Sequence, residues 1–156
     1  MPTEREQHAY DDLTAWTLSQ REGGFIHQHV VDVWAAQHAD EKSKPIGIAF
    51  ALIGLYLHLN EGFSGREVQL VHMRLAQPHG RGPSRKEWPH FPIPKERARM
   101  TVIDVMAAPD NARGQAIDLW CRSVWEVWNR SHKVVGEWVA RDLGDLRRHR
   151  LPPTSG

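Results

Sequence analysis

The chain has 156 residues, which is enough for one domain that buries a core without disulfides or metals. Its formal net charge of +1 gives no electrostatic case for binding nucleic acid or a membrane surface. The single cysteine, Cys121, excludes an intrachain disulfide and a cysteine-rich zinc site, and fits a reducing compartment. The charged N-terminus lacks an apolar signal core, and no apolar run reaches the ~20 residues of a membrane span. We therefore expect a cytoplasmic protein.

Apolar residues recur at helical spacing along the chain, and strand-type alternation is absent. We predict an all-α bundle of about five helices, with a long proline-rich loop before the last two. One domain should cover residues 1–145, followed by a disordered tail over 146–156. The expected helices, in chain order, cover residues 10–20, 25–40, 46–60, 65–77, 101–108 and 110–143.

Several helix boundaries carry local signals. Pro45 suits the first turn of a helix, where its missing N–H costs nothing. Ser64 and Glu67 form the S-x-x-E pattern of a capping box, and Thr101 with Asp104 resembles it. The stretch 78–94 is too rich in proline and glycine for regular structure. Its aromatic residues should anchor a long crossover on the bundle, and the alternative role is that of a lid over a site.

The helix over residues 25–40 contains three histidines. His27, Trp34 and His38 fall on one face, but His27 and His38 lie ~16 Å apart and cannot hold one metal ion between them. Gln28 and Asp32 form a second, more polar stripe on the same helix. An antiparallel arrangement with the next two helices places His27 level with His58. It also places Asp32 level with His72, one to two turns deeper.

Two functions are compatible with this polar centre. In the first, the protein is a metal-binding protein or a metal-dependent enzyme. Its ligands to zinc, iron, nickel or manganese would be His27, Asp32, His58 and His72. The residues expected to line that site are Gln28, His29, His38, Tyr56 and Trp88. In the alternative, the protein is a non-catalytic module that binds a small molecule or a protein. The same histidines would then form a hydrogen-bonded core and no cofactor would be needed.

The sequence contains no H-E-x-x-H, no phosphate-cradling glycine loop and no G-x-S-x-G elbow, so it names no reaction or substrate. Cys121 lacks an identifiable base and is a poor candidate nucleophile. We expect no nucleic-acid or membrane partner. The sequence is compatible with a monomer or an oligomer.

Motifs along most of the chain resemble a bacterial family of unknown function. They are HQ-x-x-V-D-x-x-A-x-Q-H at 27–38, KPI-x-x-x-F-A-L-I-G-L-Y-L-H at 44–58, V-H-M-x-L-A at 71–76, WP-x-F-x-x-P at 88–94, T-V-x-D-V-x-A-A at 101–108 and W-C-x-S-V-W-E at 120–126. The resemblance implies a mostly helical single domain without an established activity. Some relatives begin with a C-P-G-C zinc-knuckle motif, which this chain lacks, so that zinc role does not carry over. In architecture and histidine placement the chain is also similar to the DinB-like metal-binding bundles, a likeness that confers little on function.

Overall fold

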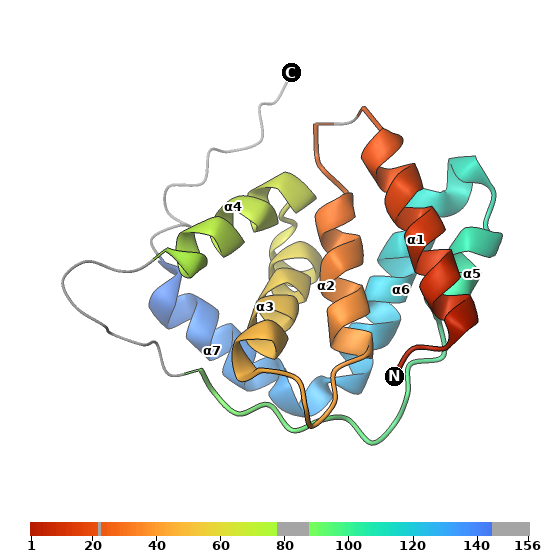
Figure 1. Ribbon diagram of the computed structural model, residues 1–156. Helices are drawn as coiled ribbons and strands as arrows, with labels where there is room; N and C mark the ends of the chain where they lie inside the picture. Colours follow the sequence, from red (N-terminus) through yellow and green to blue (C-terminus); the bar gives the residue numbers. More distant parts are fainter. Residues whose placement is uncertain (22, 78–87, 145–156) are drawn as a thin grey trace.

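The computed structural model describes residues 1–21, 23–77 and 88–144, and over these ranges it contains helices and no strand (Figure 1). The seven α-helices are α1 (Glu4–Ser19), α2 (His27–Gln37), α3 (Pro45–Glu61), α4 (Gly65–Ala76), α5 (Val102–Ala107), α6 (Arg113–Val127) and α7 (His132–Asp142). Two 3₁₀ turns precede α6 and α7: η1 (Asp110–Ala112) and η2 (Asn129–Ser131). The all-α prediction is confirmed, whereas the prediction of about five helices is too low. The expected disordered tail and residues 78–87 of the loop lie outside the described residues.

Three capping boxes fix the first turns of α1, α4 and α5. In each box the side chain of Thr3, Ser64 or Thr101 accepts from a backbone N–H of the first turn. The acidic side chain three residues later accepts from the backbone N–H of the cap, so two backbone donors are satisfied at each helix start. The boxes at Ser64 and Thr101 were predicted. The box at Thr3 was not, and it starts α1 six residues earlier than the sequence indicated.

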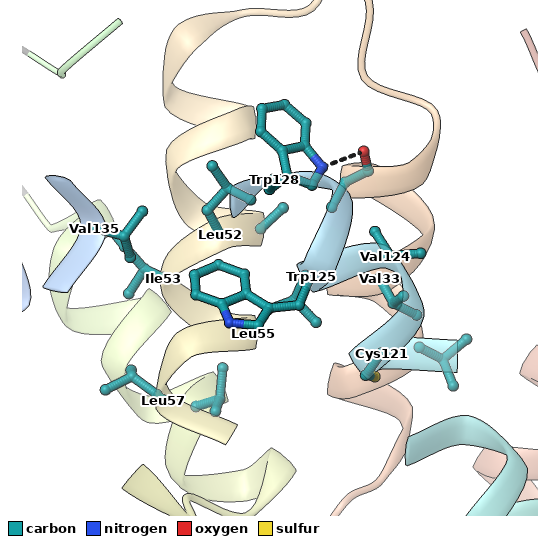
Figure 2. Close-up of a cluster of buried hydrophobic side chains, with 14 of the residues drawn as sticks. Val33, Leu52, Ile53, Leu55, Leu57, Cys121, Val124, Trp125, Trp128 and Val135 are labelled. Atoms are coloured by element: carbon teal, nitrogen blue, oxygen red, sulfur yellow. Dashed lines mark hydrogen bonds between the residues drawn. The ribbon is translucent and has the colours of Figure 1, made fainter. Parts of the chain in front are cut away.

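The long final helix expected over 110–143 is wrong, because η2 separates α6 from α7. The segment holds no proline, and the reason for the break is tertiary. Trp128 is almost fully buried, and its indole Nε1 donates to the Ala36 carbonyl at 3.2 Å (Figure 2). That carbonyl lies at the end of α2, where helical carbonyls lose their intrahelical partners. The helix therefore ends where a buried tryptophan must reach the end of another helix.

Helix α3 lies at the centre of the molecule and contacts α2, α4, α6 and α7 (Figure 1). Most of its side chains from Ile48 to Leu57 are buried, as expected of a helix that is apolar on all sides. Helices α1 and α5 pack against each other at the far side of α2 and α6. The arrangement places polar side chains of α2 and α3, such as Asp32 and His58, beside groups of neighbouring helices.

The described end of the proline-rich loop, from Trp88 onward, packs on the bundle, as predicted. Phe91 is buried, and the half-buried ring of Trp88 lies edge-on to Phe50 at 5.6 Å between centroids. Trp88 also stacks on Trp138 of α7 at 5.3 Å. These contacts anchor the crossover that leads back to α5.

Candidate functional site

A carboxylate–imidazole pair connects α2 and α4. Nε2 of His72 lies 3.2 Å from Oδ1 and 3.4 Å from Oδ2 of Asp32. One turn earlier on α2, the Gln28 amide nitrogen donates to Asp32 Oδ1 at 3.1 Å. The sequence predicted both the i,i+4 contact and the shared layer of Asp32 and His72. The structure brings these three side chains together.

The carboxylate of Asp32 is buried because α3 approaches it closely at Gly54. A Cβ added to Gly54 would stand 2.6 Å from Asp32 Cγ and would overlap the carboxylate oxygen. Asp32 is 3% exposed, and burial raises the pKa of its carboxyl, although the hydrogen bond from His72 acts in the opposite direction. A glycine in the middle of a helix costs about 1 kcal/mol relative to alanine. At this position it makes room for a buried ionisable group.

The ring of His72 is held on a second side by Phe50 of α3, which stacks parallel to it at 4.9 Å between centroids. Its other nitrogen, Nδ1, is buried and has no hydrogen-bond partner among the described residues. A carboxylate that orients an imidazole is the arrangement of a general base. The buried position of Nδ1 keeps that nitrogen from solvent, so the pair is better placed to orient neighbours than to exchange protons with water.

An open groove of about 420 Å³ lies over this pair, between α2, α3 and α4. Its size is within the range of small-molecule sites. Its lining is mostly apolar and comprises Gln28, Val31, Asp32, Ala35, Gly47, Phe50, Ala51, Gln69, His72, Met73 and Ala76. The small side chains at the rim, such as Ala35 and Ala76, are exposed to solvent. The groove thus combines apolar walls with a few polar groups at its floor.

A second pair connects α3 and α6. His58 Nε2 lies 2.8 Å from Oδ1 of Asp118, whose side chain is 51% exposed. The hydrogen bond from His58 lowers the pKa of the Asp118 carboxyl. His58 Nδ1 lies 3.2 Å from the Phe63 carbonyl, so both ring nitrogens face acceptors, and only the imidazolium form donates to both.

The ring of His58 stacks on His29 of α2, with 3.5 Å between centroids and 19° between planes. His29 is buried, and desolvation together with the nearby charge of His58 lowers its pKa to about 3. His29 is therefore neutral at pH 7. The sequence placed His58 level with His27, whereas the structure pairs it with His29.

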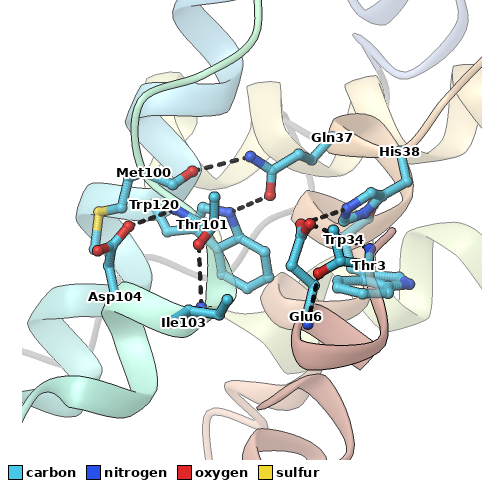
Figure 3. Close-up of polar contacts among 10 residues, drawn as sticks. All are labelled: Thr3, Glu6, Trp34, Gln37, His38, Met100, Thr101, Ile103, Asp104 and Trp120. Atoms are coloured by element: carbon cyan, nitrogen blue, oxygen red, sulfur yellow. Dashed lines mark hydrogen bonds and ion pairs between the residues drawn. The ribbon is translucent and has the colours of Figure 1, made fainter. Parts of the chain in front are cut away.

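His27 and His38 occupy other environments. His27 Nδ1 lies 2.9 Å from the Thr17 hydroxyl of α1, and burial lowers the His27 pKa. His38 bridges the Trp34 carbonyl and the Glu6 carboxylate (Figure 3). Burial raises the pKa of Glu6, but its bonds with His38 and Thr3 outweigh that effect and lower it. Both histidines therefore fasten α1 to α2.

Two other residues expected to line a site have packing contacts. Tyr56 lies edge-on to Trp125, with 6.2 Å between centroids, and a Cβ added to Gly136 would lie 3.5 Å from its ring. Trp88 contacts Phe50, which lines the groove. Neither side chain lines the groove over Asp32 and His72.

The four expected metal ligands are not gathered into one cluster. Within residues 1–21, 23–77 and 88–144, no group of three or more His, Cys, Asp or Glu side chains could hold a metal ion. Instead, the histidines make hydrogen bonds to hydroxyl, carbonyl and carboxylate groups of the protein. The expected arrangement fails because a comparison of heights along the helices does not fix which faces meet.

Two contributors to these sites were missed. Asp118 stands at an exposed position of an amphipathic helix, where a carboxylate is unremarkable in sequence. Gln69 acquires its role only when α4 is placed beside α2 and α3. The expectation for Cys121 agrees with its environment, because burial raises the pKa of the thiol well above its usual value.

No helix in the described part of the chain is long and apolar enough to cross a membrane. No curated protein and no solved structure matches the chain significantly. The model of a family of unknown function, DUF5946, matches residues 7–129. This match includes both carboxylate–imidazole pairs and the groove, and it agrees with the resemblance seen in the sequence motifs. The chain belongs to the DUF5946 family.

Proposed function

We propose that this protein is a small-ligand-binding protein and that the groove between α2, α3 and α4 is its binding site. The observation that carries the proposal is the buried pair of Asp32 and His72 beneath an open, mostly apolar groove. Buried ionisable pairs seldom improve stability over apolar residues of the same volume. Groups with environments of this kind concentrate at functional sites.

The surface around the groove supports the same function. Met73 is 55% exposed and Leu70 49% exposed on α4, and Ile46 is 42% exposed at the start of α3. Scattered exposed apolar residues need no explanation. Met73 lines the groove, and Leu70 and Ile46 are sequence neighbours of the lining residues Gln69 and Gly47. A ligand that covered Met73 would bury apolar area, which would contribute to its affinity.

The proposal is tested by titrating the full chain with 1-hexanol, a neutral apolar probe, and following backbone amide NMR signals. We expect saturable shifts at residues of the groove, such as Ala35, Gly47 and Ala76. Ala35→Trp should fill the exposed rim and abolish them. Ala140→Trp is the matched control, because Ala140 is an exposed alanine on α7. Shifts that are absent from the groove, or that survive Ala35→Trp, would contradict the proposal.

A further inference from the structure

Helices α2 and α4 begin side by side and then separate, which gives the groove a closed end and an open end. The Arg66 backbone N–H donates to the Gly24 carbonyl at 2.7 Å, and Gly65 touches the Phe25 carbonyl so closely that a Cβ would collide with it. From there α4 runs obliquely away from α2 (Figure 1). The groove is therefore narrow near the helix starts and open near their ends.

Two glutamine side chains stand toward the closed end, and neighbours fix the direction of each amide. Gln28 donates its NH₂ group to Asp32, so its Oε1 is left as an acceptor. Arg66 donates to Oε1 of Gln69 at 2.6 Å, so the NH₂ group of Gln69 is left as a donor. Neither remaining group has a partner among the described residues. The closed end thus offers one acceptor and one donor.

The groove offers no free charge to a ligand. Among its lining residues only Asp32 and His72 have ionisable side chains, and these two are paired with each other. A charged head group would lose its hydration without gaining a counter-charge, which is costly. The walls beyond the glutamines are apolar. From Gln28 to Ala35 the groove follows α2 for ~10 Å, at ~1.5 Å per residue.

We propose that the ligand of this groove is a neutral carboxamide with a short apolar chain. This inference rests on the function proposed above. The carboxamide N–H donates to Gln28 Oε1, and its carbonyl oxygen accepts from Gln69 Nε2. The apolar chain lies over Phe50 and Ala51 toward the open end. Asp32 acts as a positioning residue, because its carboxylate holds the Gln28 amide in the direction that binding requires.

The test compares four six-carbon probes on the full chain at pH 7: hexanamide, 1-hexanol, hexylammonium and hexanoate. Dissociation constants are measured from the amide signals of the groove. Hexanamide should bind about 3- to 10-fold more tightly than 1-hexanol, the worth of one additional net hydrogen bond. It should bind at least about 10-fold more tightly than either ion, because a charged head is desolvated without a partner.

Variants of Gln69 separate the ligand class from the groove itself. Gln69→Leu should reduce hexanamide affinity to about that of 1-hexanol and leave 1-hexanol binding unchanged. Gln69→Glu should increase hexylammonium affinity. Gln115→Leu is the control, because Gln115 is exposed on α6 outside the groove.

The outcomes distinguish two failures. If 1-hexanol binds the groove but an ion binds as tightly as hexanamide, or Gln69→Leu has no effect, the carboxamide assignment is wrong and the groove remains a binding site. If none of the four probes shifts the amide signals of the groove, the proposed function itself is wrong.

Discussion

His29 is a buried neutral imidazole. It stacks on the ring of His58, which has a hydrogen-bond partner at each of its two nitrogens. Its pKa of about 3 is well below the ~6.5 of an unfolded histidine, because burial and the adjacent charge of His58 disfavour a second positive charge. Asp118 opposes this effect from the far side of His58. Between pH 6.5 and 3 the unfolded chain therefore binds a proton at this residue that the folded chain does not.

The consequence is a loss of stability as the pH falls through 6.5 toward 3. One such proton changes the free energy of unfolding by up to about 1.4 kcal/mol per pH unit. We expect His29→Phe, which keeps a stacked ring but cannot titrate, to remove this component. Urea unfolding of both proteins at pH 7, 6, 5 and 4 measures it. Parallel stability curves for the two proteins would show that His29 is not the titrating group.

The residue scale also shows where sequence reasoning ends. The height of each side chain along the bundle followed from turn positions, so Asp32 and His72 were placed together correctly. Which face of a helix meets its neighbour depends on rotation about the helix axis, and the turn positions do not determine that rotation. For this reason His27 was predicted as the neighbour of His58, whereas the structure has His29 there. Asp118 could not be anticipated, because its role depends on where α6 packs against α3.

At the scale of secondary-structure elements, α2 and α3 come close together at Gly54, and this contact makes room for the Asp32 carboxylate. A methyl group at this position collides with the Asp32 carboxylate, which is also held by Gln28 and His72. Alanine favours an isolated helix by about 1 kcal/mol over glycine. Here overpacking and disruption of the buried pair should outweigh that gain, since overpacking alone costs about 1–3 kcal/mol.

We therefore expect Gly54→Ala to lower the free energy of unfolding by about 1–2 kcal/mol in urea titrations. Gly47→Ala is the matched control on the same helix, because a Cβ there meets nothing within 4 Å. This control should be neutral or slightly stabilising. An equal effect of the two substitutions would mean that helix propensity, and not the contact with Asp32, governs both.

Helix starts were easier to predict than helix ends. Capping boxes such as Ser64 with Glu67 are local patterns of four residues, and the overlooked Thr3 with Glu6 follows the same pattern. The division of α6 from α7 has no local signal. It depends on Trp128 reaching Ala36, a residue 92 positions earlier in the chain. Tertiary contacts of this kind override helical periodicity.

At the scale of the whole molecule, the segment that begins at Trp88 connects the α3 and α7 side of the bundle to α5. The ring of Trp88 contacts the rings of both Phe50 and Trp138, so it anchors the crossover and supports the wall of the groove.

Trp88→Ala should lower the free energy of unfolding by about 1–3 kcal/mol, less than for a fully buried tryptophan. His90→Ala, an exposed neighbour, should change it by less than about 0.5 kcal/mol. If thermal or urea unfolding shows no difference between the two variants, the anchoring role of Trp88 is wrong.

The contacts that complete α2 also set the order in which the protein can mature. Two tryptophans donate hydrogen bonds to the end of α2. Trp120 of α6 donates to the Gln37 side chain, and Trp128, the C-cap of α6, donates to the Ala36 carbonyl. At 5–20 residues per second, a ribosome needs roughly 5–20 s to add the 92 residues that separate Ala36 from Trp128. For the part of that interval between residues 61 and 113, the apolar helix α3 has been made but its covering helices α6 and α7 have not. The nascent chain thus exposes the apolar surface of α3 until the later helices, with Trp128 among them, have been made.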